Sequence, residues 1–197
     1  SGPVPVHRAL RAAWGPIDRA MHDAALALGY PAHGDLNAPE GEGVATYPIN
    51  SRDGIRVSTN EAFLEPARGR ANLAIMGGAL VERVLLDGMR ACGVRVRLHG
   101  RGWVDIAARD VVLCAGAVHS PAILMRSGIG DPASLAQHGI AVAHALAEVG
   151  RNFMDHPMLR AAVELKREHR PTDLDARHTN VCVSYSSGLA GAARRDM

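Results

Sequence analysis

The stretch VVLCAGAVHSPAILMRSGIG, residues 111–130, decides the fold of this 197-residue chain. Its first four residues are all apolar, which is typical of a strand that is buried on both faces. Three small residues follow, and they allow another backbone or a ligand to approach the turn closely. Ser120 then stands at a predicted N-cap, Pro121 at the first helical position and Gly128 at the helix end. The stretch therefore predicts a buried strand, a tight turn and a short helix.

Composition narrows the possible function classes. Apolar residues make up 47% of the chain and charged residues 21%, as in an ordinary globular protein. The net charge of +2 and the 4% aromatic content do not favour a nucleic-acid partner. No run of about eighteen consecutive apolar residues occurs, so no membrane span is expected.

The cysteines and histidines do not follow a metal-binding pattern. Cys92, Cys114 and Cys182 are an odd number of widely separated residues, and we expect the first two to be small packing residues. The ten histidines are dispersed along the chain, so no metal site is expected. This cysteine usage favours a reducing compartment, and we expect the protein to be cytoplasmic.

The residues before position 59 predict helices followed by a long loop. Apolar residues at helical spacing predict a helix over 16–28 that Gly29 ends. A shorter helix is expected over 7–14. Frequent glycine and proline predict a loop over 30–58.

The central region predicts strands on both sides of a hairpin. Short strands are expected over 72–76 and 79–86, and alternating patterns over 94–98 and 103–107 predict an antiparallel hairpin. This hairpin precedes the buried strand 111–114. A second short helix is expected to begin after Asp131 and to end at Gly139, and further strands are expected over 159–165 and 177–183.

The helix of the opening stretch also carries a family resemblance. Gly116, Ala117, Ser120, Pro121, Leu124, Met125 and the run Ser127–Gly130 resemble the second signature of the glucose-methanol-choline (GMC) flavin oxidoreductases. Ordinary capping explains several of these residues, but it does not require Ser127, Ile129 and Gly130 together. The segment 60–67, NEAFLEPA, is similar to the family's approach to its flavin domain.

A second segment extends the resemblance but departs from the family pattern just upstream. The run 148–157, EVGRNFMDHP, resembles the family's Gly-x-Asn-x-x-Asp-His segment. Where the family often has Pro-Gly, this chain has Ala147-Glu148. The resemblance covers about Gly34 to Pro157 and identifies the chain as a central fragment of such an enzyme.

The resemblance implies an α/β fold in two parts. One part belongs to a doubly wound, Rossmann-like domain that binds flavin adenine dinucleotide (FAD) and carries an antiparallel β excursion. The other consists of pieces of an α+β substrate-binding domain. The implied division is a substrate-domain or linker piece at 1–58, the central part of the FAD domain at 59–157, and the start of the substrate domain at 158–197.

The resemblance also assigns cofactor contacts. In these enzymes a strand valine holds the adenine edge through its backbone N–H and C=O, and this valine corresponds to Val81. Ala115 and Gly116 would lie beside the ribose and phosphates, where larger side chains would collide with the nucleotide. Helix–sheet packing explains Ala115 and Gly116 equally well when each is taken singly, and the Val81 side chain would pack in a buried strand in either case.

For the intact relative, the resemblance implies oxidation of the CH–OH group of a small alcohol, with hydride passing to flavin N5. The family's Gly-x-Gly-x-x-Gly phosphate loop and its proton-abstracting histidine have no counterpart in these residues, so no catalytic residue is assigned and no turnover is expected. His156 follows an aspartate, but a structural or solvated role is favoured for it. The sequence leaves open a lyase on the same scaffold, a non-catalytic truncated product, and the choice among oxygen, a quinone or another electron acceptor.

Overall fold

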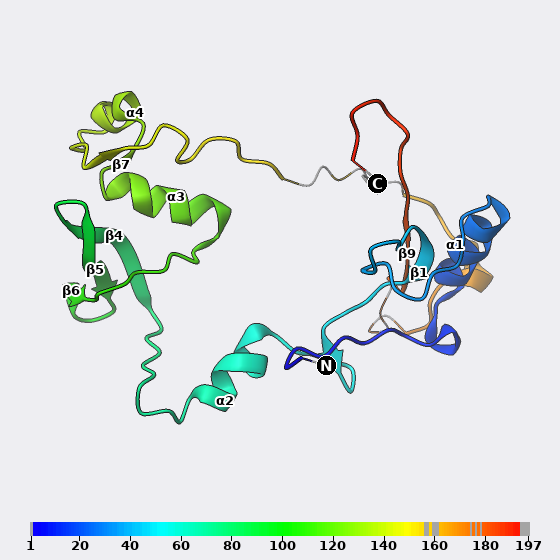
Figure 1. The fold of residues 1–197 in the computed structure, drawn as a ribbon. Coiled ribbons are helices and arrows are strands. Elements are labelled where there is room, and N and C mark those ends of the chain that lie inside the picture. Colours follow the sequence, from blue (N-terminus) through cyan, green and yellow to red (C-terminus); the bar gives the residue numbers. More distant parts are fainter. Residues whose placement is uncertain are drawn as a thin grey trace. The chain divides into compact units, whose positions relative to one another are not determined.

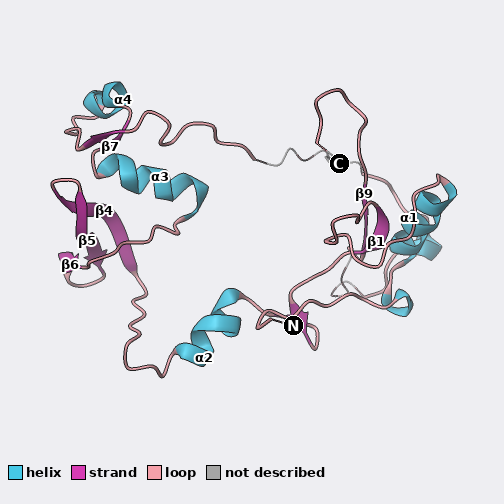
Figure 2. Cartoon of the chain, in the orientation of Figure 1, coloured by secondary structure: helices cyan, strands magenta, loops and turns pink. Residues whose placement is uncertain are grey.

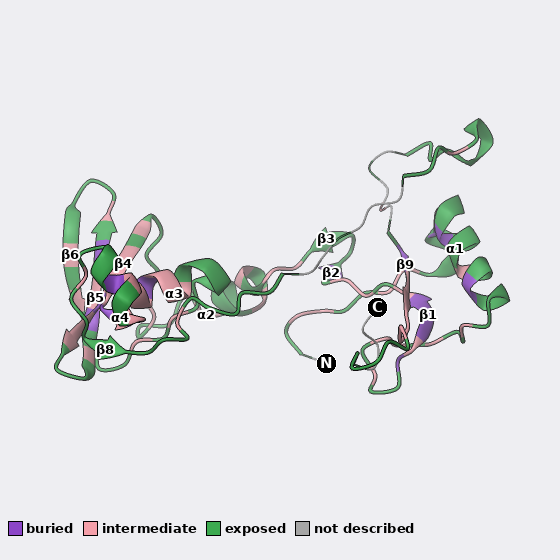
Figure 3. Cartoon of the chain, turned by 90° about the horizontal axis from the view of Figure 1, so that it is seen from above, coloured by how far each residue is buried: buried purple, intermediate pink, exposed green. Residues whose placement is uncertain are grey.

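A computed structural model describes residues 2–155, 158, 162–173, 175, 177 and 179–193. The chain forms two compact units (Figure 1). The first combines Ser1–Leu73 with Ala161–Met197, and the second is Ala74–Arg160. Each unit has its own buried residues (Figure 3).

The first unit joins the two ends of the chain through a strand pair. β1 (Gly43–Thr46) pairs antiparallel with β9 (Val181–Ser184), and α1 (Pro16–Ala27) packs against both. The core consists of Trp14, Ala25, Val44 and Val181. The remaining elements are the helical turns η1 (Arg11–Ala13), η2 (Asn60–Leu64), α2 (Glu65–Ala67) and η3 (Arg167–His169), and the hairpin of β2 (Ser51–Arg52) with β3 (Ile55–Arg56).

The second unit is an antiparallel sheet with a helix against its first strand. The sheet has the order β4-β5-β6, formed by β4 (Ala79–Asp87), β5 (Arg90–Leu98) and β6 (Gly102–Ala107). α3 (Gly116–Arg126) contacts β4. A small parallel pair, β7 (Ile129–Gly130) with β8 (His144–Ala145), and α4 (Pro132–Gln137) follow (Figure 2).

Several predicted elements are confirmed. The mixed α/β class is observed, and the expected hairpin is present with Val94 opposite Ile106 and Val96 opposite Val104. α1 covers the predicted helix and Gly29 follows it with φ = +92°. α4 begins after Asp131, whose carboxylate accepts a 3.0 Å hydrogen bond from the Ser134 amide.

The strand predicted over 111–114 is not formed. These residues are extended but unpaired, and Val112 is 83% exposed. A buried strand needs neighbours on both edges, and no strand in the described part of the chain pairs with this segment. An apolar run alone therefore did not decide the backbone pairing.

The start of the following helix also differs from the prediction. α3 begins at Gly116, so Ser120 lies within the first turns and Pro121 lies inside the helix. The Ser120 hydroxyl instead accepts a 3.0 Å hydrogen bond from the Ala115 amide. This contact stabilises a start five residues earlier than the Ser-Pro pair predicted.

Other predictions were too long or wrong. The helix expected over 7–14 is only the turn η1, and residues 72–76 form no strand. The predicted strand 177–183 begins only at Val181. Of the strand predicted over 159–165, residues 162–165 are irregular and the rest lies outside the described residues.

The packing role predicted for two cysteines is wrong, because Cys92 and Cys114 are exposed. Cys92 lies at a shift in the β4–β5 register, opposite no residue of β4, and Cys114 lies in the unpaired segment 111–114. Neither position is covered by a second layer, so neither side chain packs into a core. Cys182 in β9 is half-buried, and burial raises the pKa of its thiol.

Candidate functional site

Val81 lies on the edge strand of the three-stranded sheet. It is half-buried in β4 and stands opposite Val96 of β5. The register shifts immediately after it, because Glu82 has no partner and Arg83 stands opposite Arg95. β4 therefore contains a β-bulge at Glu82.

The bulge determines which way the Val81 backbone points. Antiparallel strands exchange hydrogen bonds only at alternate residues. The Val84 amide donates away from β5, to the Ser127 hydroxyl at 2.8 Å, so the Arg83–Arg95 pair is the hydrogen-bonded one. Across the bulge the alternation resets, and the N–H and C=O of Val81 point outward from the sheet. No strand in the described part of the chain covers this edge of β4.

Ala115 and Gly116 lie together at the start of α3, and both are exposed. Gly116 has φ = +82°, and an added Cβ there would meet nothing within 4 Å. The N-cap residue Ala115 makes no side-chain capping bond of its own, and its amide donates to the Ser120 hydroxyl. The positive end of the helix dipole therefore faces open space at Gly116, an arrangement suited to an anionic group.

A groove runs alongside this first turn. Ala117 and Pro121 of α3 and Asn152 and Phe153 of the following loop line a cavity of about 410 Å³. Because Pro121 has no N–H, the Ala117 carbonyl lacks the helical donor that position 121 would otherwise supply. Asn152 adopts φ = +55° and donates a 2.8 Å hydrogen bond to the Glu148 carboxylate. The predicted motif 148–157 thus contributes one wall of the groove.

α3 connects the predicted residue Val81 with the predicted pair Ala115 and Gly116. Ala115 and Gly116 lie at its start, and Arg126 and Ser127 at its end bind β4 next to Val81. In the described part of the chain, this helix rather than a direct hydrogen bond joins them. The sequence did not predict that Arg126 bonds β4 or that β4 has a bulge at Glu82. The adjacent run Ser127–Gly130, which capping alone does not explain, was the one sequence feature that marked this end of α3.

The exposed face of the sheet carries paired charges. The Arg95 guanidinium donates two 2.7 Å hydrogen bonds to the Asp105 carboxylate, and these bonds hold the pKa of Asp105 below its usual range. Arg97 lies over the Trp103 ring, with its central guanidinium carbon 5.9 Å from the ring centroid, close enough for a cation–π contact. Arg95 and Arg97 are therefore each held by a partner on β6.

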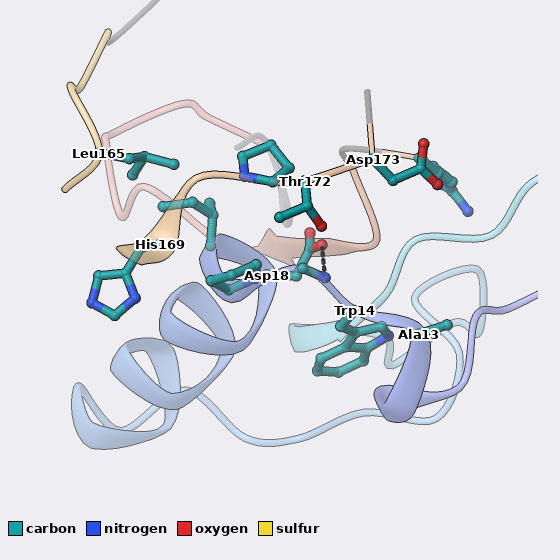
Figure 4. A pocket seen from close by; sticks show the side chains of 12 residues that line it. Ala13, Trp14, Asp18, Leu165, His169, Thr172 and Asp173 are labelled. Carbon is teal, nitrogen blue, oxygen red and sulfur yellow. Dashed lines mark hydrogen bonds between the residues drawn. The ribbon is translucent and has the colours of Figure 1, made fainter. Parts of the chain in front are cut away.

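The first unit contains a separate pocket (Figure 4). It has a volume of about 480 Å³ and is lined by Trp14, Asp18, His169 and Thr172, among others. Asp18 accepts a 3.0 Å hydrogen bond from the Gly15 amide and is also bound by Asn180. Its carboxylate oxygens therefore accept hydrogen bonds within the fold and are not free to bind a ligand. His156, singled out from the sequence, lies outside the described residues.

Comparison with known proteins identifies the family. The family model described as GMC oxidoreductase matches residues 2–158. The chain belongs to the GMC oxidoreductase family. This assignment confirms the resemblance found in the signature over 116–130.

Individual relatives agree with the assignment. The chain is 41% identical over 157 residues to a GMC-type oxidoreductase from Rhodococcus erythropolis, covering 80% of this chain and 32% of that protein. It is 40% identical over 155 residues to an oxygen-dependent choline dehydrogenase from Klebsiella pneumoniae, covering 77% and 28%. Among solved structures, pyridoxine 4-oxidase from Mesorbium loti has a TM-score of 0.72 and 37% identity, covering 75% and 29%.

The chain spans about a third or less of the length of these relatives. GMC oxidoreductases are FAD-dependent, which confirms the cofactor expected from the sequence. No helix in the described part of the chain has the length and apolar character needed to cross a membrane.

Proposed function

We propose that this chain supplies the adenine-nucleotide part of the FAD site of an oxidoreductase that oxidises the CH–OH group of a small alcohol. The observation that carries the proposal is the outward-pointing backbone of Val81 at a sheet edge that no strand in the described part of the chain covers. The glycine-started helix α3 supports it. Both lie within the region that matches the family.

The residues present fit the nucleotide chemically. The Val81 N–H donates to a ring nitrogen of the adenine edge, and its C=O accepts from the exocyclic amine. Ala115 and Gly116 leave room for the ribose and phosphates, and the amides of the first turn of α3 donate toward negative charge. When bound, FAD accepts the hydride that leaves the alcohol carbon.

The domain assignment follows from the same proposal. Residues 59–157 contribute to the FAD domain, and residues 1–58 and 158–197 contribute to the substrate domain. The relatives named as a choline dehydrogenase and a pyridoxine 4-oxidase support an oxidoreductase with a small organic substrate. We expect the 197-residue chain by itself to bind FAD without turning over an alcohol, since the family's proton-abstracting histidine has no counterpart in these residues.

The test is FAD binding by the purified 197-residue chain, measured by visible absorbance after dialysis and by titration of flavin fluorescence. Gly116→Leu places a side chain in the open space of the nucleotide site, and we expect it to raise the Kd for FAD by roughly tenfold or more, a loss of about 1.4 kcal/mol or more.

Gly100→Leu is the matched control. Gly100 has φ = +75° and equally open surroundings, but it lies in the turn between β5 and β6. It therefore carries the same backbone strain without entering the proposed site. A chain that never retains FAD, or equal losses in the two variants, would contradict the proposal.

A further inference from the structure

We propose that Arg126 and Ser127 are positioning residues for the adenine ring, because they fasten the end of α3 to β4 at Glu82 and Val84, next to Val81. This inference rests on the proposed FAD site. It assigns to the end of α3 a role in cofactor recognition that is separate from the contacts at its start.

The two residues form a clamp on β4, one at the bulged residue Glu82 and the other at Val84. The Arg126 Nε donates to the Glu82 carbonyl at 2.6 Å. The Ser127 hydroxyl accepts from the Val84 amide at 2.8 Å and donates to the Ile123 carbonyl at 2.7 Å. Ser127 thus links the strand to the helix through both its donor and its acceptor, and its oxygen has a fixed orientation.

The clamp bonds two backbone groups of β4 that point away from β5. An unsatisfied carbonyl or amide that is partly buried lowers stability. Arg126 satisfies the Glu82 carbonyl and Ser127 satisfies the Val84 amide, so the edge of β4 beside Val81 is held in a fixed position against α3.

The clamp also places both halves of the nucleotide site on one rigid element. α3 has eleven residues, which at about 1.5 Å per residue span roughly 16 Å. Its first residues are Gly116 and Ala117, and the clamp closes its other end. The helix therefore relates the nucleotide contacts at its start to the position of Val81.

The experiment compares FAD with its hypoxanthine analogue, which lacks the exocyclic amine that the Val81 carbonyl would bind. The readout is the ratio of the two Kd values, measured by flavin fluorescence titration. We expect the protein to prefer FAD, and we expect Ser127→Ala and Arg126→Gln each to reduce this preference roughly fivefold to tenfold, about the effect of one hydrogen bond.

Two variants separate positioning from general loosening. Ser127→Thr keeps the hydroxyl and should restore the preference. Ser134→Ala removes a hydroxyl from α4 and should leave the preference unchanged. A variant that merely loosens the fold weakens both ligands equally and leaves the ratio as it was.

The outcomes are distinct. If the unmodified protein prefers FAD and Ser127→Ala keeps the full preference, the clamp has no positioning role and this inference is overturned alone. If the unmodified protein binds neither dinucleotide, the proposed function fails and the positioning role fails with it. Hydrogen exchange at the Val84 amide, which should accelerate in Ser127→Ala with or without cofactor, provides a readout independent of binding.

Discussion

At the scale of single residues, a buried carboxylate ties the two ends of the chain together. Asp18 of α1 is 6% exposed and accepts 2.9 Å hydrogen bonds from both the backbone amide and the side-chain amide of Asn180. Burial raises the pKa of Asp18, but the hydrogen bonds from Asn180, Gly15 and Val181 outweigh it and hold the pKa below its usual range. The ionised form is therefore the one that the fold stabilises.

We expect Asp18→Asn to lower the free energy of unfolding by about 2 kcal/mol at pH 7, since it removes a charged acceptor and sets two amide groups against each other. A carboxylate with a depressed pKa contributes stability above its unfolded pKa of about 3.9 and loses it as the pH falls through the folded pKa. The difference between variant and parent should thus shrink below about pH 4 in urea unfolding curves.

Asp23→Asn is the control, because Asp23 lies exposed on the same helix and is paired with Arg11. Screening by solvent makes such a pair weak, so little change is expected. A difference between Asp18→Asn and the parent that stays constant down to pH 2 would show that the charge of Asp18 is not what stabilises the fold.

At the scale of elements, the turn from α3 into β7 requires glycine for two reasons. Gly128 has φ = +82°, and an added Cβ would lie 2.5 Å from the Ala141 carbonyl oxygen. Gly139 has φ = +67°, but a Cβ there would meet nothing within 4 Å. A comparison of Gly128 with Gly139 therefore separates the cost of a left-handed backbone from the cost of a steric collision.

We expect Gly139→Ala to cost about 1–2 kcal/mol from the left-handed backbone alone. Gly128→Ala should cost about 1–3 kcal/mol more, because the Ala141 backbone must move. Thermal unfolding followed by circular dichroism measures both. Equal losses of stability in the two variants would mean that residues 141–143 move aside without an energetic cost. Only the left-handed backbone conformation would then require glycine.

At the scale of the whole molecule, the first unit depends on a strand from the far end of the chain. Val44 of β1 stands opposite Val183 of β9, and Val181 belongs to the same core as Trp14. The second unit is continuous in sequence, from Ala74 to Arg160, and has its own buried residues. The two units should therefore respond differently to loss of the C-terminal segment.

Removal of residues 161–197 should abolish hydrogen-exchange protection of the Ala45 and Tyr47 amides, because β1 loses its partner strand and the Tyr47 amide loses the Asn180 carbonyl that accepts from it. The Val84 and Val96 amides of the second unit should keep their protection and serve as an internal control. Exchange by mass spectrometry with peptide resolution distinguishes the two. A parallel loss at Val96 would show that the units unfold as one.

By itself, the sequence determined the mixed α/β class, the helices at 16–27 and 132–137, the hairpin of β5 with β6 and the family, because local periodicity, caps and a dense signature encode them. The tertiary structure alone decided the pairing of β1 with β9, the early start of α3 and the bulge at Glu82. At the bulge, the Glu82 carbonyl accepts a hydrogen bond from Arg126, 44 residues further along the chain, and no local pattern at Glu82 can encode so distant a contact.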